Sequence, residues 1–93
     1  MTFDPSATLL RTTDAIATEV DGEIVLISIE DGRYYGMDAV GSEIWRRLES
    51  PKRVDALIAE LQAHFDGPAE AVAADTRAFL GKLAENRLVW TEA

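Results

Sequence analysis

The spacing of apolar residues changes near residue 38 of this 93-residue chain. Before that point, short β-branched runs cover residues 15–20 and 23–29, and Asp21 and Gly22 join them. An Asp-Gly pair between such runs favours a type I′ hairpin turn, which needs a positive φ at both central residues. A second turn, at residues 30–32, leads into a third run over residues 33–37. The sequence therefore predicts a meander of three antiparallel strands.

After residue 38 the apolar residues recur with a period of about 3.6 residues, which is typical of helices that bury one face. Asp38 is a suitable N-cap for a first helix over residues 39–49. A second helix is predicted over residues 52–65, with Ser50 as its N-cap and Pro51 in the first helical position. A third helix is predicted over residues 69–86, and residues 88–90 form a short closing segment.

We therefore predict an α+β, winged helix-turn-helix-like fold: a three-stranded antiparallel sheet followed by three helices (βββααα), which cover one face of the sheet. A chain of this length buries roughly 60–65% of its unfolded surface, enough for one modest core. Residues 1–14 show only a weak pattern, and we expect an irregular N-terminal segment in which Leu9 and Leu10 dock on the core. Residues 15–93 are expected to form a single domain.

Strand parity assigns the two tyrosines of the third strand to opposite faces of the sheet. If Met37 points inward just before the first helix, Tyr35 shares its face because alternate residues of a strand point the same way. Tyr34 then lies on the exposed face or edge of a terminal strand.

Charge and composition exclude several function classes. Acidic residues outnumber basic ones 17 to 9, and the net charge of −8 repels phosphate backbones and anionic lipid. The chain has no cysteine, and its one histidine, His64, has no partner motif for catalysis or metal binding. No apolar run approaches a membrane span, and the first residues lack the features of a signal peptide. We therefore predict a cytoplasmic protein that is not an enzyme, has no metal or cofactor, and binds neither nucleic acid nor membrane.

The most specific motif is Gly32-Arg33-Tyr34-Tyr35-Gly36-Met37-Asp38, which runs directly into a helix carrying Ile44-Trp45. With the three strands and two further helices, it resembles the PqqD-like family, the winged-helix leader-recognition elements of ribosomal peptide natural-product pathways. The resemblance covers roughly residues 15–89. Met37 and Asp38 stand where the family usually has Leu and Asn, and both keep the expected role of inward apolar residue and N-cap. The connection at residues 50–53 is unusual for the family.

This resemblance implies a non-catalytic peptide chaperone. Such a protein binds the leader of a ribosomally made precursor peptide by edge-strand addition and delivers it to a separate modifying enzyme or leader peptidase in trans. Lasso-peptide biosynthesis is the favoured pathway, with pyrroloquinoline quinone precursor chaperoning as the alternative. A regulatory protein-interaction subunit also remains open. A winged-helix DNA-binding protein is disfavoured, because the basic residues of the third helix are offset by acids.

The binding site is predicted between the third strand and the third helix. The last strand of a meander has a free edge to which an extended peptide can add. On a helical wheel, Asp75, Phe79 and Lys82 fall at one margin of the apolar arc, next to buried positions. The predicted leader-binding residues are Arg33, Tyr34, Tyr35, Gly36, Met37, Val72, Asp75, Thr76, Phe79, Lys82 and Leu83.

Two alternatives stay open at the level of sequence. The opposite margin of the third helix, Ala73, Leu80 and Ala84, could line the groove instead, and Val72, Phe79 and Leu83 could all be ordinary core residues. A second candidate surface is basic: it is either a docking patch for an acidic partner or a solvated surface beside the C-terminal end of the first helix. Its residues are Arg46, Arg47, Lys52 and Arg53.

Overall fold

The predicted meander is present in the structure, a computed structural model that describes residues 3–92. Strands β2 (Ala15–Val20), β3 (Glu23–Ser28) and β4 (Tyr34–Gly36) form an antiparallel sheet in the order β2-β3-β4. The first turn has positive φ at both central residues, 53° at Asp21 and 83° at Gly22, as a type I′ turn requires. Strand β4 is one residue shorter at each end than predicted.

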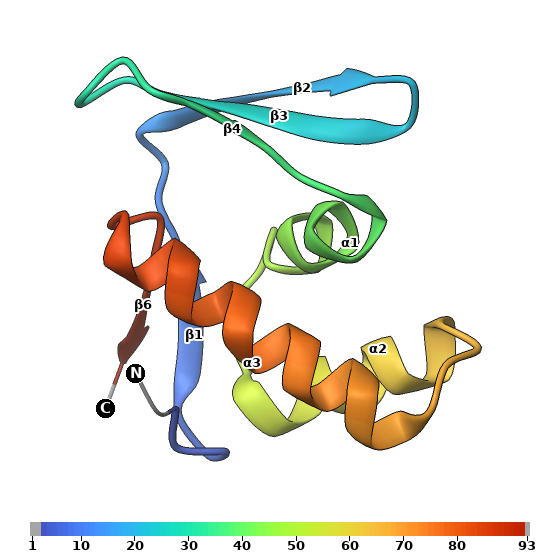
Figure 1. The fold of residues 1–93 in the computed structure, drawn as a ribbon. Coiled ribbons are helices and arrows are strands. Elements are labelled where there is room, and N and C mark those ends of the chain that lie inside the picture. The colour runs from blue at the N-terminus through green and yellow to red at the C-terminus, as the bar shows by residue number, and fades with distance from the viewer. Residues whose placement is uncertain (1–2, 93) are drawn as a thin grey trace.

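Three helices follow, α1 (Ala39–Arg47), α2 (Val54–His64) and α3 (Ala69–Glu85), and they lie on one side of this sheet (Figure 1). The backbone N–H of Gly41 donates to Asp38 Oδ1 at 2.8 Å, so the predicted N-cap of α1 is confirmed. The architecture is therefore the predicted α+β fold, with the sheet followed by three helices.

The predicted start of the second helix is wrong. Helix α2 begins at Val54 with Arg53 as its N-cap, and Ser50 and Pro51 lie outside it. Residues Lys52–Arg53 form a short strand, β5, which pairs with the N-terminal part of the chain. Because this pairing needs an extended backbone, the helix cannot begin until the strand ends.

The prediction of an irregular N-terminal segment is also wrong for part of its length. Strand β1 (Thr8–Arg11) is the central strand of a second antiparallel sheet, in the order β5-β1-β6, where β6 is Val89–Glu92. Leu9 has no exposed surface, and Phe3 is buried as well. The second sheet pairs the N-terminal strand β1 with the C-terminal strand β6, which lie side by side in Figure 1. Met1, Thr2 and Ala93, which belong to the two predicted segments, lie outside the described residues.

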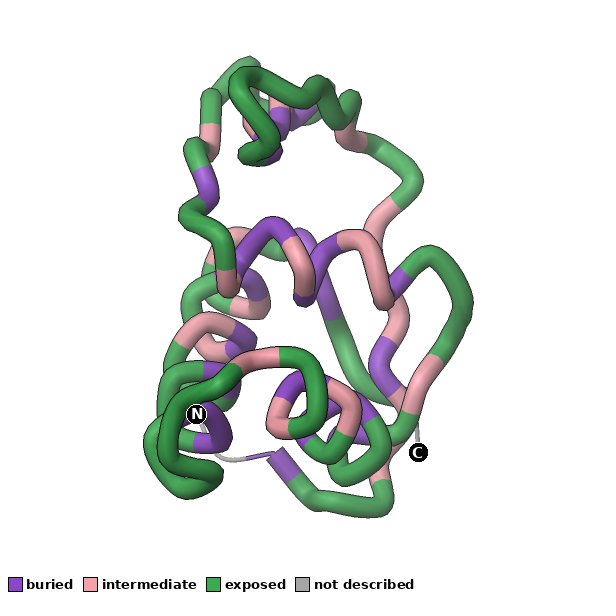
Figure 2. The backbone as a smooth tube through the Cα atoms, turned by 90° about the vertical axis from the view of Figure 1, so that its right-hand side faces the viewer, coloured by how far each residue is buried: buried purple, intermediate pink, exposed green. Residues whose placement is uncertain are grey.

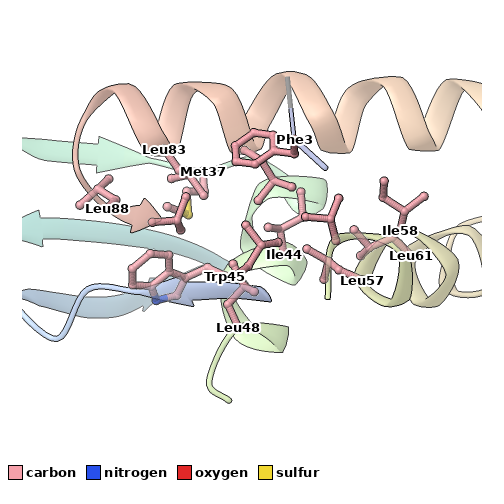
Figure 3. Packing of buried hydrophobic residues seen from close by; sticks show 14 of the residues in the cluster. Phe3, Met37, Ile44, Trp45, Leu48, Leu57, Ile58, Leu61, Leu83 and Leu88 are labelled. Atoms are coloured by element: carbon pink, nitrogen blue, oxygen red, sulfur yellow. The ribbon is translucent and has the colours of Figure 1, made fainter. Parts of the chain in front are cut away.

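The hydrophobic core runs beneath α3, from Met37 and Leu88 at one end to Ile58 and Leu61 at the other (Figure 3). Trp45 is part of this core and is 3% exposed. The hydroxyl of Ser42 on α1 accepts a hydrogen bond from the backbone N–H of Ile24 at 2.8 Å and so ties α1 to β3.

The predicted parity of β4 is confirmed. Met37 is buried, Tyr35 packs against the core, and Tyr34 is 73% exposed. None of the helices within residues 3–92 combines the length and apolar character that crossing a membrane requires.

Candidate functional site

A groove lies between strand β4 and helix α3. Its larger part is a hollow of about 550 Å³, with β4 on one side and the C-terminal half of α3 on the other. A smaller hollow of about 290 Å³ shares Asp38, Phe79 and Lys82 with it and extends toward Asp75. We call the two together the β4–α3 groove. The residues that line it are Tyr34, Tyr35, Gly36, Met37, Asp38, Val40, Asp75, Ala78, Phe79, Lys82, Leu83, Asn86 and Leu88.

Phe79 lines both hollows, and its position depends on a glycine of α1. A Cβ atom placed on Gly41 would lie 2.6 Å from Phe79 Cζ, far closer than van der Waals contact allows. The half-buried ring of Phe79 therefore packs directly on the backbone of α1, where only glycine leaves room for it. Gly41 sets the depth of the groove at this point.

Gly41→Ala should destabilise the protein, although a Gly→Ala change inside a helix ordinarily stabilises it by up to about 1 kcal/mol. The new methyl group displaces the Phe79 ring, and overpacking of this kind costs about 1–3 kcal/mol. Urea unfolding measures the stability, and the NMR signals of the Phe79 ring report its displacement. The matched control is Gly81→Ala on α3, where the added Cβ meets nothing within 4 Å and should stabilise the protein. Equal stabilisation by both changes would contradict this packing.

A hydrogen bond joins β4 to the C-terminal end of α3 within the groove lining. The hydroxyl of Tyr35 donates to Asn86 Oδ1 at 3.4 Å, and Asn86 Nδ2 donates to the backbone carbonyl of Lys82 at 2.8 Å. Sequence reasoning missed Asn86, although it continues the helical stripe of Phe79 and Lys82 by one further turn. Leu88 was also missed as a lining residue, and it follows the helix, where periodicity gives no signal.

The free edge of β4 offers backbone groups to a visiting strand. Met37 N–H donates to Ile24 O, and Ser28 N–H donates to Arg33 O, both at 2.9 Å. Since backbone groups of an antiparallel strand alternate between its two sides, those of Tyr34 and Gly36 point away from β3. The N-terminal strand β1 does not cover this edge, because it pairs with β5 and β6.

Not every predicted site residue reaches the groove. Val72 and Thr76 are buried and line neither hollow, and the hydroxyl of Thr76 donates to Val72 O at 2.8 Å. Val72 is part of the hydrophobic core cluster and Thr76 has no exposed surface, so their positions are core positions. Arg33 lies at a separate hollow beside the turn between β3 and β4. The remaining predicted residues are brought together along the groove.

The rival margin of α3 does not form a groove wall in this structure. Ala73 and Leu80 are buried in the core, and Leu80 has no exposed surface. Ala84 is half-buried and packs against the same core.

The basic surface of the sequence is paired with acids of the same chain. Arg47 contacts Glu43 at 2.8 Å and Glu60 at 3.0 Å, and Lys52 contacts Glu60 at 3.0 Å. The hydrogen bond from Lys52 lowers the pKa of Glu60 below its ordinary value. The other two bases of this surface are also paired, Arg46 with Glu19 and Arg53 with Asp55. These contacts favour the interpretation as a solvated surface over a docking patch for an acidic partner.

Comparison with known proteins decides the family. A family model described as coenzyme PQQ synthesis protein D (PqqD) matches residues 23–89, which include β3, β4 and all three helices. The chain belongs to the PqqD family. It has the fold of a RiPP recognition element, a domain that takes part in the making of ribosomally synthesized and post-translationally modified peptides. No curated protein matches the chain.

Three solved structures share the fold. TbiB1 in complex with the TbiA(beta) leader peptide is 33% identical, with a TM-score of 0.78 over 90% of this chain and 98% of that one. Lasso peptide synthetase B1 complexed with its leader peptide is 17% identical, with a TM-score of 0.73 over 88% and 96% of the two chains. The PqqD truncation of Methylobacterium extorquens PqqCD is 18% identical, with a TM-score of 0.75 over 96% and 95%. Standalone PqqD domains of this kind are non-catalytic, and within residues 3–92 no cluster of side chains could hold a metal ion.

Proposed function

We propose that this protein binds the leader of a ribosomally made precursor peptide by adding it as a strand to the free edge of β4. The observation that carries the proposal is that unpaired backbone groups of β4 lie beside a groove with apolar side chains at its floor and charged side chains at its rim. Main-chain hydrogen bonds to Tyr34 and Gly36 supply affinity, and the groove beside them accepts alternate side chains of the added strand. TbiB1, which is 33% identical, was solved with a leader peptide.

Side chains of the groove give the leader a defined register. Leader residues that point to the inner side of the sheet meet the ring of Phe79 and the side chain of Leu83, which form an apolar floor. Asp75 and Lys82 lie at the rim, both exposed, and present opposite charges to the ends of the bound segment. Because charge complementarity fixes register more than it raises affinity, these two residues discriminate among leaders.

Asp75→Ala and Lys82→Ala should each weaken leader binding by about fivefold, the loss expected for one hydrogen bond of about 1 kcal/mol at a solvent-exposed rim. As exposed helix residues, they should change the stability by less than about 0.5 kcal/mol. Isothermal titration with a synthetic leader peptide of the cognate precursor measures the affinity, and amide shifts of the wild type map the site. Arg77→Ala, an exposed base of α3 that does not line the groove, is the control. Unchanged affinity in both variants, with shifts confined to residues 46–53, would place the site elsewhere.

The bound precursor is handed to a separate modifying enzyme or leader peptidase, which acts in trans. We favour a lasso-peptide pathway, since one of the solved structures with this fold is a lasso peptide synthetase B1 complexed with the leader peptide. Pyrroloquinoline quinone synthesis is the alternative, supported by the family description. The genes beside this one distinguish the two: a short precursor with a protease and a cyclase indicates the first, and a radical enzyme indicates the second.

Reconstitution tests the delivery role. Processing of full-length precursor by the enzyme should require this protein, and equal processing without it would refute delivery. A regulatory subunit would change the enzyme's activity without binding the leader. A DNA-binding role has little support, since Arg77 and Lys82 of α3 share the helix with Glu70 and Asp75.

A further inference from the structure

The outer face of the β2-β3-β4 sheet is apolar and is covered by no other element of residues 3–92. Among the described residues, Tyr34, Ile29, Ile16 and Val20 are 73%, 62%, 54% and 53% exposed, and all belong to this sheet or follow it directly. The helices lie on the opposite side (Figure 1). In the burial colouring of Figure 2, β2 and β4 are mostly exposed, while β3 alternates between buried and intermediate residues. We call this surface the outer face; its apolar residues are Ile16, Val20, Val25, Ile27, Ile29 and Tyr34.

Strand register makes these side chains neighbours. Ile27 of the central strand pairs with Ile16 on one side and with Tyr34 on the other, so one apolar row crosses all three strands. Ile29 lies two residues after Ile27 and points to the same face. Its backbone N–H donates to Asp14 O at 2.9 Å, which extends the β2–β3 pairing to this residue. A single exposed apolar residue is ordinary, but a contiguous patch indicates an interaction surface.

The border of the outer face is acidic. Asp21 and Glu23 lie at one end of the hairpin, where Arg46 donates to Gly22 O from the helix side at 2.9 Å. Glu30 and Asp31 lie at the other end, where Arg87 contacts Glu30 at 3.5 Å, so acids outnumber bases along the border. Strand parity directs the side chain of Arg33 to the inner side of the sheet.

These charges determine what can cover the face. A second copy would bring like-charged borders together, and each chain carries a net charge of −8. The complementary occupant is a protein surface that is apolar at its centre and bordered by lysine and arginine.

The outer face is continuous with the proposed leader site. Tyr34 belongs to both, because its backbone groups point to the free edge while its side chain lies on the outer face. A leader strand added to β4 would widen the sheet by one strand, and its alternate side chains would extend the outer face. A protein docked there touches the domain and the bound leader together.

We propose that the outer face is the docking surface for the enzyme that acts on the bound precursor. This rests on the proposed function, and it assigns the enzyme a surface that shares only Tyr34 with the β4–α3 groove. The enzyme's complementary surface is apolar with a basic border, so docking weakens as salt rises.

The test uses the double variant Ile16→Thr/Val20→Thr and the processing enzyme encoded next to this chain's gene. Threonine keeps the β-branched shape that strands favour while removing apolar surface, and β2 is the strand farthest from the leader edge. Affinity for the enzyme, measured with the leader-loaded domain, should fall at least about tenfold. Affinity for the leader alone should stay unchanged. Trp90→Thr is the control, since it removes a side chain that is 49% exposed on the other sheet.

A charge reversal tests the acidic border. Glu23→Lys, on the outer face, should weaken enzyme binding and reduce its salt dependence, while Glu70→Lys on α3 should not. If both outer-face variants keep full affinity for the enzyme, the proposed docking surface is wrong. That result would not contradict the proposed leader binding. Weaker leader binding in the double variant, or a wild-type dimer in sedimentation that the double variant abolishes, would also overturn the docking surface. Failure of the wild type to bind leader would refute the proposed function itself.

Discussion

Gly36→Pro should reduce leader affinity at least about tenfold while the domain stays folded. The backbone N–H of Gly36 points to the free edge of β4, so proline removes a donor that the leader needs without removing one that β3 uses. Edge strands tolerate proline where the lost N–H faces solvent. The ring also occupies the space through which a visiting backbone must approach, so the loss exceeds that of one hydrogen bond.

Two controls separate this effect from general damage to the sheet. Gly36→Ala keeps the N–H, and its Cβ would meet nothing within 4 Å, so leader binding should be retained. Ala17→Pro removes an outward-pointing N–H from β2, at the opposite edge of the sheet, because the register of β2 and β3 directs the N–H of Ala17 away from β3. It should leave leader affinity unchanged.

Isothermal titration gives the affinities, and urea unfolding shows that all three variants are folded. If Gly36→Pro binds the leader as well as Gly36→Ala does, strand addition at β4 is wrong. Loss of binding in Ala17→Pro alone would move the leader to the β2 edge.

Local signals predicted the elements on which the proposed leader site is built. The Asp21-Gly22 turn specifies its own backbone geometry, and Asp38 caps α1 through a contact only three residues away. Once Met37 is assigned to the inner face, the alternation of side chains along a strand assigns Tyr35 to the inner face and Tyr34 to the outer face. Such features depend on residues that are close in sequence, so one sequence suffices to find them.

The second sheet could not be found in the same way. Strand β1 pairs with β5, more than forty residues later, and with β6 near the other end of the chain. Four-residue and two-residue strands carry too few alternations for a periodic pattern, and their stability comes from partners that no local window contains. Ser50 and Pro51 form an acceptable helix start by local rules, and only the pairing of Lys52 with Leu9 rules it out.

Partners that are distant in sequence also decide which of the predicted residues of α3 reach the groove. Spacing along α3 identified a margin with Asp75, Phe79 and Lys82, and the structure places all three at the groove. Spacing could not separate them from Val72 and Thr76, because the burial of those two residues depends on which other elements pack against α3.

Leu9→Ala should lower the free energy of unfolding by about 2–5 kcal/mol, the cost of emptying a fully buried leucine site. Leu9 has no exposed surface and lies on the central strand of the second sheet, paired with Lys52 on one side and Thr91 on the other. A domain of this size has a total stability of only about 5–15 kcal/mol, so the change removes a large part of it. Equilibrium unfolding in urea, followed by tryptophan fluorescence from buried Trp45, measures the loss.

Leu10→Ala is the matched control, since Leu10 is on the same strand but only half-buried, and it should cost about 1 kcal/mol. A chain shortened to residues 15–93 tests the predicted domain boundary directly. It loses β1, which leaves β5 and β6 without their shared partner and exposes the core that Leu9 covers. We expect this shortened chain to be largely unfolded. If it unfolds at the same urea concentration as the full chain, and Leu9→Ala costs no more than Leu10→Ala, β1 contributes nothing to the cooperative unit and the boundary at residue 15 holds.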